Sequence, residues 1–179
     1  ALAVLPMLSI GGMQLFKTES YETPDKVVPK AASFAAGISI VYISLTIIWA
    51  FMLWGAGMSI FDSIAHAMTT LATGGYSTKS ESLAAFDSST IEIIIIFGML
   101  VGSLPFVHYL TLTKNGIKNL IKDDQVKLFL TLVFFVVLIM SLYLSSNNIP
   151  YFEALRLSSF NVISIITGTG FGTSDFNNW

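Results

Sequence analysis

Long stretches without a charged residue dominate the 179-residue chain. Residues 31–61, 93–113 and 128–152 contain no Asp, Glu, Lys or Arg and consist mostly of Ala, Val, Ile, Leu and Phe. Each stretch reaches the roughly 18 to 20 apolar residues that indicate a helix crossing a bilayer. A soluble protein of this size would not tolerate three such runs, so the pattern predicts a polytopic membrane protein.

Two shorter apolar runs, residues 59–72 and about 150–166, each lead into a polar hairpin rich in Gly and Thr. Ser59 and Asp62 open the first run at the spacing of a helix capping box. As a helix with a rise of about 1.5 Å per residue, this run reaches about 21 Å, short of the roughly 30 Å hydrocarbon core. We therefore predict two short helices that enter the membrane and return to the same side through their hairpins.

The basic residues support this topology. Seven of the nine lie in or beside two polar connections, near residues 17–30 and 113–127. Because Lys and Arg are enriched in cytoplasmic loops, both connections are predicted to be cytoplasmic. A complete crossing by residues 59–72 would put the connections on opposite sides of the membrane. Charge and length therefore agree on a re-entrant loop.

The second half of the chain repeats the pattern of the first half after a shift of 95 residues. The shift pairs residues of the same or similar type: Ser63 with Ser158, Gly75 with Gly170, Tyr76 with Phe171, and Thr78 with Thr173. Spans, short helices and hairpins coincide as well, which is the signature of an internal repeat. We expect an all-α polytopic membrane protein with tandem helix–re-entrant pore loop–helix repeats of the potassium-channel type.

The two hairpins have the composition of a cation pathway. Unpaired carbonyls in hydrocarbon cost several kcal/mol each, so polar hairpins at membrane depth need a purpose. Potassium filters replace the hydration shell of the ion with backbone carbonyls from four loops, typified by Thr-Val-Gly-Tyr-Gly. Gly permits the backbone conformations that this requires. The partially negative C-terminal ends of the two short helices would also favour a cation.

Eight residues are expected to line the ion path through their backbone carbonyls: Thr73, Gly74, Gly75, Tyr76, Gly168, Thr169, Gly170 and Phe171. The first hairpin matches the filter pattern at Thr, Gly and Tyr, and the second at its two later glycines, with Phe in place of Tyr. Three residues are expected to support the pore helices: His66, Thr78 and Thr173. For His66, a hydrogen bond that fixes helix packing is favoured over proton transfer.

Other interpretations of the hairpins remain open. A nucleotide-binding loop would need a strand before it and a helix after it, and ordinary turns outside the membrane would explain the glycines alone. A transporter with broken helices would require an inverted repeat, whereas the two copies here run in the same direction. A non-conducting membrane scaffold with degenerate pore loops is a further alternative, as is a different cation transporter with pore-like hairpins.

Catalysis is not indicated by the sequence. The chain contains no Cys, and it shows no paired carboxylates at membrane depth, no nucleophile–base constellation and no His/Asp metal cluster. We expect no enzyme activity, no covalent cofactor and no nucleic-acid partner.

The residues resemble the Trk/Ktr/HKT superfamily of potassium transporters, in particular its bacterial TrkH-type membrane subunits. The most specific segments are residues 3–15 (AVLPMLSIGGMQL), residues 61–78 through His66 to the first hairpin, and residues 167–173 (TGTGFGT). Gly75 and Gly170 fall where Gly accompanies potassium preference in this superfamily. Gly168 departs from the simple pattern, which has Thr there.

The resemblance implies four covalently joined repeats around one pore, with potassium as the transported ligand. It also implies a multi-pass protein of the bacterial cytoplasmic (inner) membrane, a homodimer and a cytosolic nucleotide-binding regulatory ring. The chain would be an internal fragment that needs the missing repeats from the remainder of its own protein. Its expected segments are the end of the first-repeat inner helix (1–16), a cytoplasmic loop (17–30), the second pore repeat (31–112, pore loop 59–78), a cytoplasmic loop (113–125) and the first half of the third repeat (126–179, pore loop 150–174).

Overall fold

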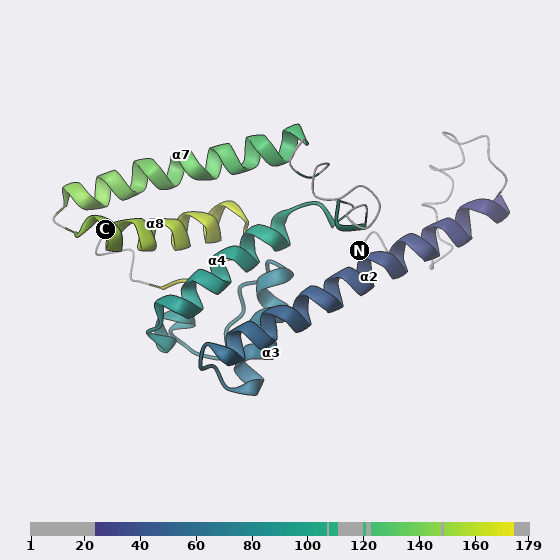
Figure 1. Ribbon diagram of the computed structural model, residues 1–179, viewed down its shortest axis with the longest axis horizontal. Coiled ribbons are helices and arrows are strands. Elements are labelled where there is room, and N and C mark those ends of the chain that lie inside the picture. The colour runs from purple at the N-terminus through teal and green to yellow at the C-terminus, as the bar shows by residue number, and fades with distance from the viewer. Residues whose placement is uncertain (1–23, 107, 111–119, 121–122, 148, 174–179) are drawn as a thin grey trace. The chain divides into compact units, whose positions relative to one another are not determined.

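The computed structural model describes residues 24–106, 108–110, 120, 123–147 and 149–173, with the backbone alone over 24–33. In chain order the elements are α2 (Pro24–Gly55), α3 (Ile60–Leu71), the 3-10 helix η2 (Ser82–Phe86), α4 (Ser89–Ser103), α7 (Asp124–Ser146) and α8 (Tyr151–Ile166) (Figure 1). These described residues contain no strand. The chain divides into compact units at 1–42 and 43–179, and every contact discussed below lies within the second.

Among the described residues, two helices are long and apolar enough to cross a membrane: Phe34–Gly55 within α2, and α7. α2 begins at Pro24, inside the segment 17–30 that was expected to be a loop. Pro is well suited to the first helical position, because the N–H that it lacks would have no partner there. The expected inner helix at 1–16 and most of the connection at 113–125 lie outside the described residues.

The remaining predicted membrane span, the uncharged stretch 93–113, does not form one uninterrupted helix. α4 is 15 residues long, and its C-cap, Leu104, has an extended backbone with φ −75° and ψ 149°. Pro105 explains the break, because its ring disfavours a helical conformation in the residue before it and it has no N–H to donate. Helical backbone is present again at Phe106. The expectation that the uncharged stretch 93–113 forms one continuous helix is therefore wrong.

The two short helices agree closely with the predicted runs. α3 has 12 residues and α8 has 16, or about 18 and 24 Å, so neither would cross a hydrocarbon core of roughly 30 Å. Ser59 is the N-cap of α3. Its Oγ accepts the backbone N–H of Asp62 at 3.1 Å and donates to the Asp62 carboxylate at 2.8 Å. The capping spacing seen in the sequence therefore fixes the start of this helix.

Two glycines on α4 let it approach α3 closely. A Cβ added to Gly98 would lie 2.5 Å from Nε1 of Trp49 and 2.6 Å from Cγ2 of Thr70. A Cβ on Gly102 would lie 2.7 Å from the carbonyl oxygen of Leu71. Small residues four positions apart are the usual means by which membrane helices reach such separations. The contact fixes the C-terminal end of α3, where the first hairpin begins.

α8 contacts both α7 and α4, and α7 and α8 lie side by side (Figure 1). An ion pair joins α8 to the first turn of α4: Nη1 of Arg156 donates to both carboxylate oxygens of Glu92, at 3.0 and 2.9 Å. Glu92 is only 6% exposed. Glu92 therefore links the start of α4 to the second half of the chain.

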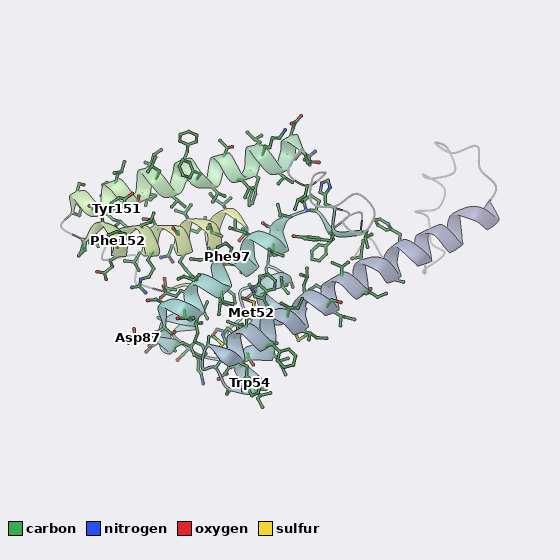
Figure 2. The ribbon with its side chains drawn as sticks, in the orientation of Figure 1. Met52, Trp54, Asp87, Phe97, Tyr151 and Phe152 are labelled. Carbon is green, nitrogen blue, oxygen red and sulfur yellow. The ribbon has the colours of Figure 1, made fainter. Side chains whose placement is uncertain are left out.

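Large apolar side chains remain exposed on these helices. Figure 2 labels five of them, which are between 43% and 86% exposed: Met52, Trp54, Phe97, Tyr151 and Phe152. Soluble monomers rarely leave extensive apolar surface uncovered. Lipid, or further segments of a larger membrane protein, would remove this surface from water.

Candidate functional site

Both hairpins leave their helices through the same turn. α3 ends at the C-cap Ala72 and α8 at the C-cap Thr167, both with a right-handed helical backbone. The N–H of each cap donates to the carbonyl four residues earlier, at 3.1 and 2.9 Å. Because these two residues lie 95 positions apart, the turn preserves the shift that defines the repeat.

Left-handed residues then occur at matching positions. Thr73 has φ 49° and its counterpart Gly168 has φ 72°. Two residues further on, Gly75 has φ 66° and Gly170 has φ 86°. This backbone explains why Gly168 departs from the filter pattern, since Gly adopts positive φ without the steric cost that Thr73 bears.

The hairpin amides turn towards the helices. The N–H groups of Thr73, Gly74, Gly168 and Gly170 all donate to carbonyls in the last turns of α3 or α8, at 2.7 to 3.2 Å. In the described part of the chain, six hairpin carbonyls accept no hydrogen bond: those of Thr73, Gly74, Gly75, Gly168, Thr169 and Gly170. Each hairpin therefore offers three consecutive carbonyl oxygens that are not used by the backbone.

A side-chain hydroxyl braces each hairpin from its helix. Oγ1 of Thr69 donates to the carbonyl of Tyr76 at 2.9 Å, and Oγ of Ser164 donates to that of Phe171 at 2.7 Å. The two donors lie 95 residues apart, and so do the two acceptors. The brace is therefore part of the repeat. These two carbonyls turn towards the helices, and each retains one further lone pair that could accept another interaction.

His66 links α3 to the C-terminal limb of the first hairpin. Its Nδ1 lies 2.7 Å from the carbonyl oxygen of Asp62, and its Nε2 lies 2.9 Å from Oγ of Ser77. A carbonyl can only accept, so Nδ1 carries the proton and a neutral ring accepts the Ser77 hydroxyl at Nε2. Oγ of Ser77 also accepts the N–H of Lys79 at 3.1 Å. The ring is fully buried.

Thr78 and Thr173, the other two predicted support residues, occupy matching positions in this arrangement. Oγ1 of Thr78 donates to the carboxylate of Asp62, which also lies 3.5 Å from Nζ of Lys79. Oγ1 of Thr173 accepts from Nδ2 of Asn161 at 3.5 Å. In both copies a Thr at the outer end of the hairpin is bonded to a polar side chain of the short helix.

The two hairpins meet directly. A Cβ added to Gly75 would overlap the carbonyl oxygen of Thr169 and would lie 2.8 Å from its carbonyl carbon. The ring of His66 stacks on that of Phe171, with centroids 5.9 Å apart and an interplanar angle of 28°. Tyr76, at the position equivalent to Phe171, is 78% exposed, whereas Phe171 is 2% exposed. All eight predicted lining residues thus belong to one paired structure, but the two aromatic positions have different surroundings.

Several residues of this structure were missed in the sequence analysis. Thr69 and Ser164 could have been found, because the 95-residue shift pairs two hydroxyl side chains in the last turns of their helices. Asp62 was recognised only as a capping residue. The Arg156–Glu92 pair has no local signal, since its members lie 64 positions apart.

Short capped helices, each returning through a braced hairpin beside long apolar helices, define a helical membrane transport protein with pore-loop repeats. The family model described as TrkH, cation transport protein, matches residues 1–179. The chain belongs to the TrkH family.

Individual relatives agree with this assignment. The chain is 36% identical over 179 residues to the Trk system potassium uptake protein TrkI of Halomonas elongata, covering 99% of this chain and 36% of that protein. It is 35% identical over 185 residues to the Trk system potassium uptake protein TrkH of Escherichia coli, covering 100% of this chain and 38% of the relative. The crystal structure of the potassium transporter TrkH from Vibrio parahaemolyticus matches with a TM-score of 0.81 and 30% identity, over 99% of this chain and 37% of that one.

The comparisons confirm the resemblance seen in the sequence and the predicted fold class, an all-helical membrane protein with pore-loop repeats. The chain spans little more than a third of the length of these relatives.

Proposed function

We propose that this chain supplies two of the four selectivity-filter loops of a potassium channel or transporter, and that the whole protein takes up potassium across the bacterial cytoplasmic membrane. One observation carries the proposal: two hairpins 95 residues apart turn amides towards their helices, and three consecutive carbonyls of each accept no hydrogen bond from the part of the chain that the structure describes. Carbonyl oxygens are the ligands with which potassium filters replace water. The relatives named as potassium uptake proteins and a potassium transporter support potassium as the ion.

The unpaired carbonyls of residues 73–75 and 168–170 are the proposed ion ligands. Tyr76 and Phe171 complete the lining at the outer end, where their carbonyls also accept a hydroxyl from the short helices. His66, Thr78 and Thr173 hold the hairpins in position. The potassium ion is transported cargo, with no covalent cofactor and no enzymatic step.

The remaining parts of the proposal follow from the same assignment. Residues 31–112 form the second pore repeat and residues 126–179 the first half of the third, preceded by the end of the first-repeat inner helix and separated by cytoplasmic loops. Two loops cannot close a ring around an ion, so the remainder of the chain provides the other two. The protein acts as a homodimer together with a cytosolic nucleotide-binding ring.

The test uses the full-length protein in bacterial cells that lack their own potassium uptake systems. Wild type should restore growth and rubidium or potassium uptake at low external potassium. Gly75→Ala should abolish uptake, because its Cβ would overlap the Thr169 carbonyl at a position with φ 66°. Gly170→Ala should reduce uptake at least about tenfold, since its φ of 86° is unfavourable to any side chain even though the surroundings are open.

Gly55→Ala is the matched control, because a Cβ there meets nothing within 4 Å and its φ is not positive. It should transport like wild type. Membrane abundance of every variant is measured by immunoblot. Normal uptake by both hairpin variants at normal abundance would refute the filter assignment.

A further inference from the structure

The outer segment of residues 79–87, between the first hairpin and α4, is bonded to the second hairpin. The N–H of Leu83 donates to the carbonyl of Gly172 at 3.1 Å, and the N–H of Gly172 donates to Oγ of Ser82 at 3.2 Å. Both backbone groups of Gly172 are therefore engaged by two consecutive residues that lie about ninety positions earlier in the chain.

Ser82 adopts a backbone conformation that Ser seldom occupies. Its φ is 55°, in the left-handed region that favours Gly. Such a conformation persists only where the surrounding structure imposes it, and it commonly accompanies a functional constraint. Here it allows the Ser82 hydroxyl to accept the N–H of Gly172 while the N–H of Leu83 donates to the Gly172 carbonyl.

The same segment is anchored to the first hairpin and to α3. Leu83 is 2% exposed. The ring of Phe86 packs edge-on against His66 with centroids 5.2 Å apart, and Nζ of Lys79 lies 5.9 Å from the centroid of the Phe86 ring. His66 is in turn bonded to the first hairpin through Ser77. The segment thus connects the outer ends of both hairpins.

Gly172 directly follows Phe171, whose carbonyl takes the Ser164 hydroxyl. The carbonyl of Gly172 accepts the N–H of Leu83, so this residue is tied to the segment 79–87 through its backbone. A shift of Gly172 would move Phe171 and Gly170 with it, because the three residues are consecutive in the chain.

We propose that residues 79–87 act as a strap that positions the second hairpin, with Ser82 as the positioning residue that sets the ion preference of this half of the filter. The inference rests on the proposed filter function. Ion selectivity in such filters arises from the carbonyls that coordinate the ion, whereas folding of the helices does not depend on them. Loss of the Ser82 hydroxyl should therefore alter ion discrimination more than it alters the amount of protein.

The experiment measures potassium uptake by the full-length protein in uptake-deficient cells, as a function of external potassium and in competition with sodium. Ser82→Ala removes the acceptor for the Gly172 N–H, and Ser82→Gly removes it while relieving the backbone. Both should raise the half-saturating potassium concentration about three- to tenfold and weaken potassium-over-sodium discrimination, at unchanged membrane abundance. Ser82→Asn keeps an acceptor and tolerates left-handed φ, so it should return both quantities to within about twofold of wild type.

Ser80→Ala is the control within the strap, because Ser80 is exposed and forms no hydrogen bond within the described residues. Wild-type affinity and discrimination in Ser82→Ala and Ser82→Gly would overturn the proposal. A loss confined to membrane abundance, equal in all Ser82 variants, would also overturn it, since that result indicates a purely structural role. Gly75→Ala is measured in parallel: if it transports normally, the filter assignment itself fails, whereas if it is inactive and the Ser82 variants are unaffected, only the strap is refuted.

Discussion

Thr73 and Gly168 hold the same left-handed position in the two hairpins with very different side chains. For a β-branched residue this conformation is an outlier, with a cost on the order of 1–3 kcal/mol. The end of α3 imposes it: the N–H of Thr73 donates to the carbonyl of Thr70 at 3.1 Å, and the N–H of Gly74 to that of Thr69 at 2.7 Å. The first hairpin is thus the more strained of the two at its entrance.

Thr73→Gly should stabilise the full-length protein by about 1 kcal/mol, because the relief of strain exceeds the added chain entropy of Gly. Gly168→Ala should destabilise it by about 1 kcal/mol although the added Cβ meets nothing within 4 Å, since φ is 72°. Thermal unfolding of the purified protein in detergent measures both. Gly55→Ala, in open space without positive φ, is the comparison. Equal stability of Gly168→Ala and Gly55→Ala would contradict the argument from backbone strain.

Between helices, packing of α4 on α3 depends on the absence of side chains at two positions. Gly98 lies against Trp49, whose Nε1 donates to the carbonyl of Ile94 at 3.0 Å. Gly102 lies against the backbone of Leu71. The two contacts differ in kind, because an indole ring can move aside at some cost whereas the last turn of a helix cannot.

Gly98→Ala and Gly102→Ala should therefore both destabilise the protein, by about 1–3 kcal/mol, with the larger loss at Gly102. The Gly98 variant should also disturb the Trp49 indole, which tryptophan fluorescence would report in a background where Trp49 is the sole Trp. Unfolding in detergent gives the stabilities. A Gly102→Ala protein as stable as wild type would mean that the two helices are not in close contact.

On the scale of the full described structure, contacts between the two expected repeats gather around the hairpins and the start of α4. The Arg156–Glu92 pair, the strap on Gly172 and the stacking of His66 on Phe171 all join residues more than 60 positions apart. The two repeats are therefore held together by a few specific polar and aromatic contacts in addition to the packing of α8 on α4.

Arg156→Gln should destabilise the protein by about 2–3 kcal/mol, because it leaves the Glu92 carboxylate buried without its partner, while the partial exposure of Arg156 moderates the loss. Adding Glu92→Gln to this variant should recover most of the loss, since no charge then remains buried. Lys127→Gln serves as the control: its pair with Asp124 is exposed, and the change should cost less than about 1 kcal/mol. A double-mutant cycle in detergent measures the coupling. Additive losses at Arg156 and Glu92 would contradict the prediction.

Local chemistry was sufficient to predict most of the elements. The uncharged runs predicted the long helices, Ser59 predicted the start of α3, and the 95-residue shift paired the two hairpins. The left-handed residues of the structure follow the same pairing. Prediction failed where a local signal was ambiguous. Pro105 ends α4 where hydropathy alone suggested a continuous span.

The sequence thus determined the class of the protein, the re-entrant helices and the positions of the two hairpins, because each depends on hydropathy, capping and backbone freedom over a few neighbouring residues. Only the tertiary structure decided that Glu92 binds Arg156, that Gly75 faces Thr169 and that Ser82 holds Gly172. These contacts join residues 64 to 94 positions apart, and no local preference encodes them. They depend on how closely the helices pack, which is why the geometry of the proposed filter could not be obtained from the sequence pattern.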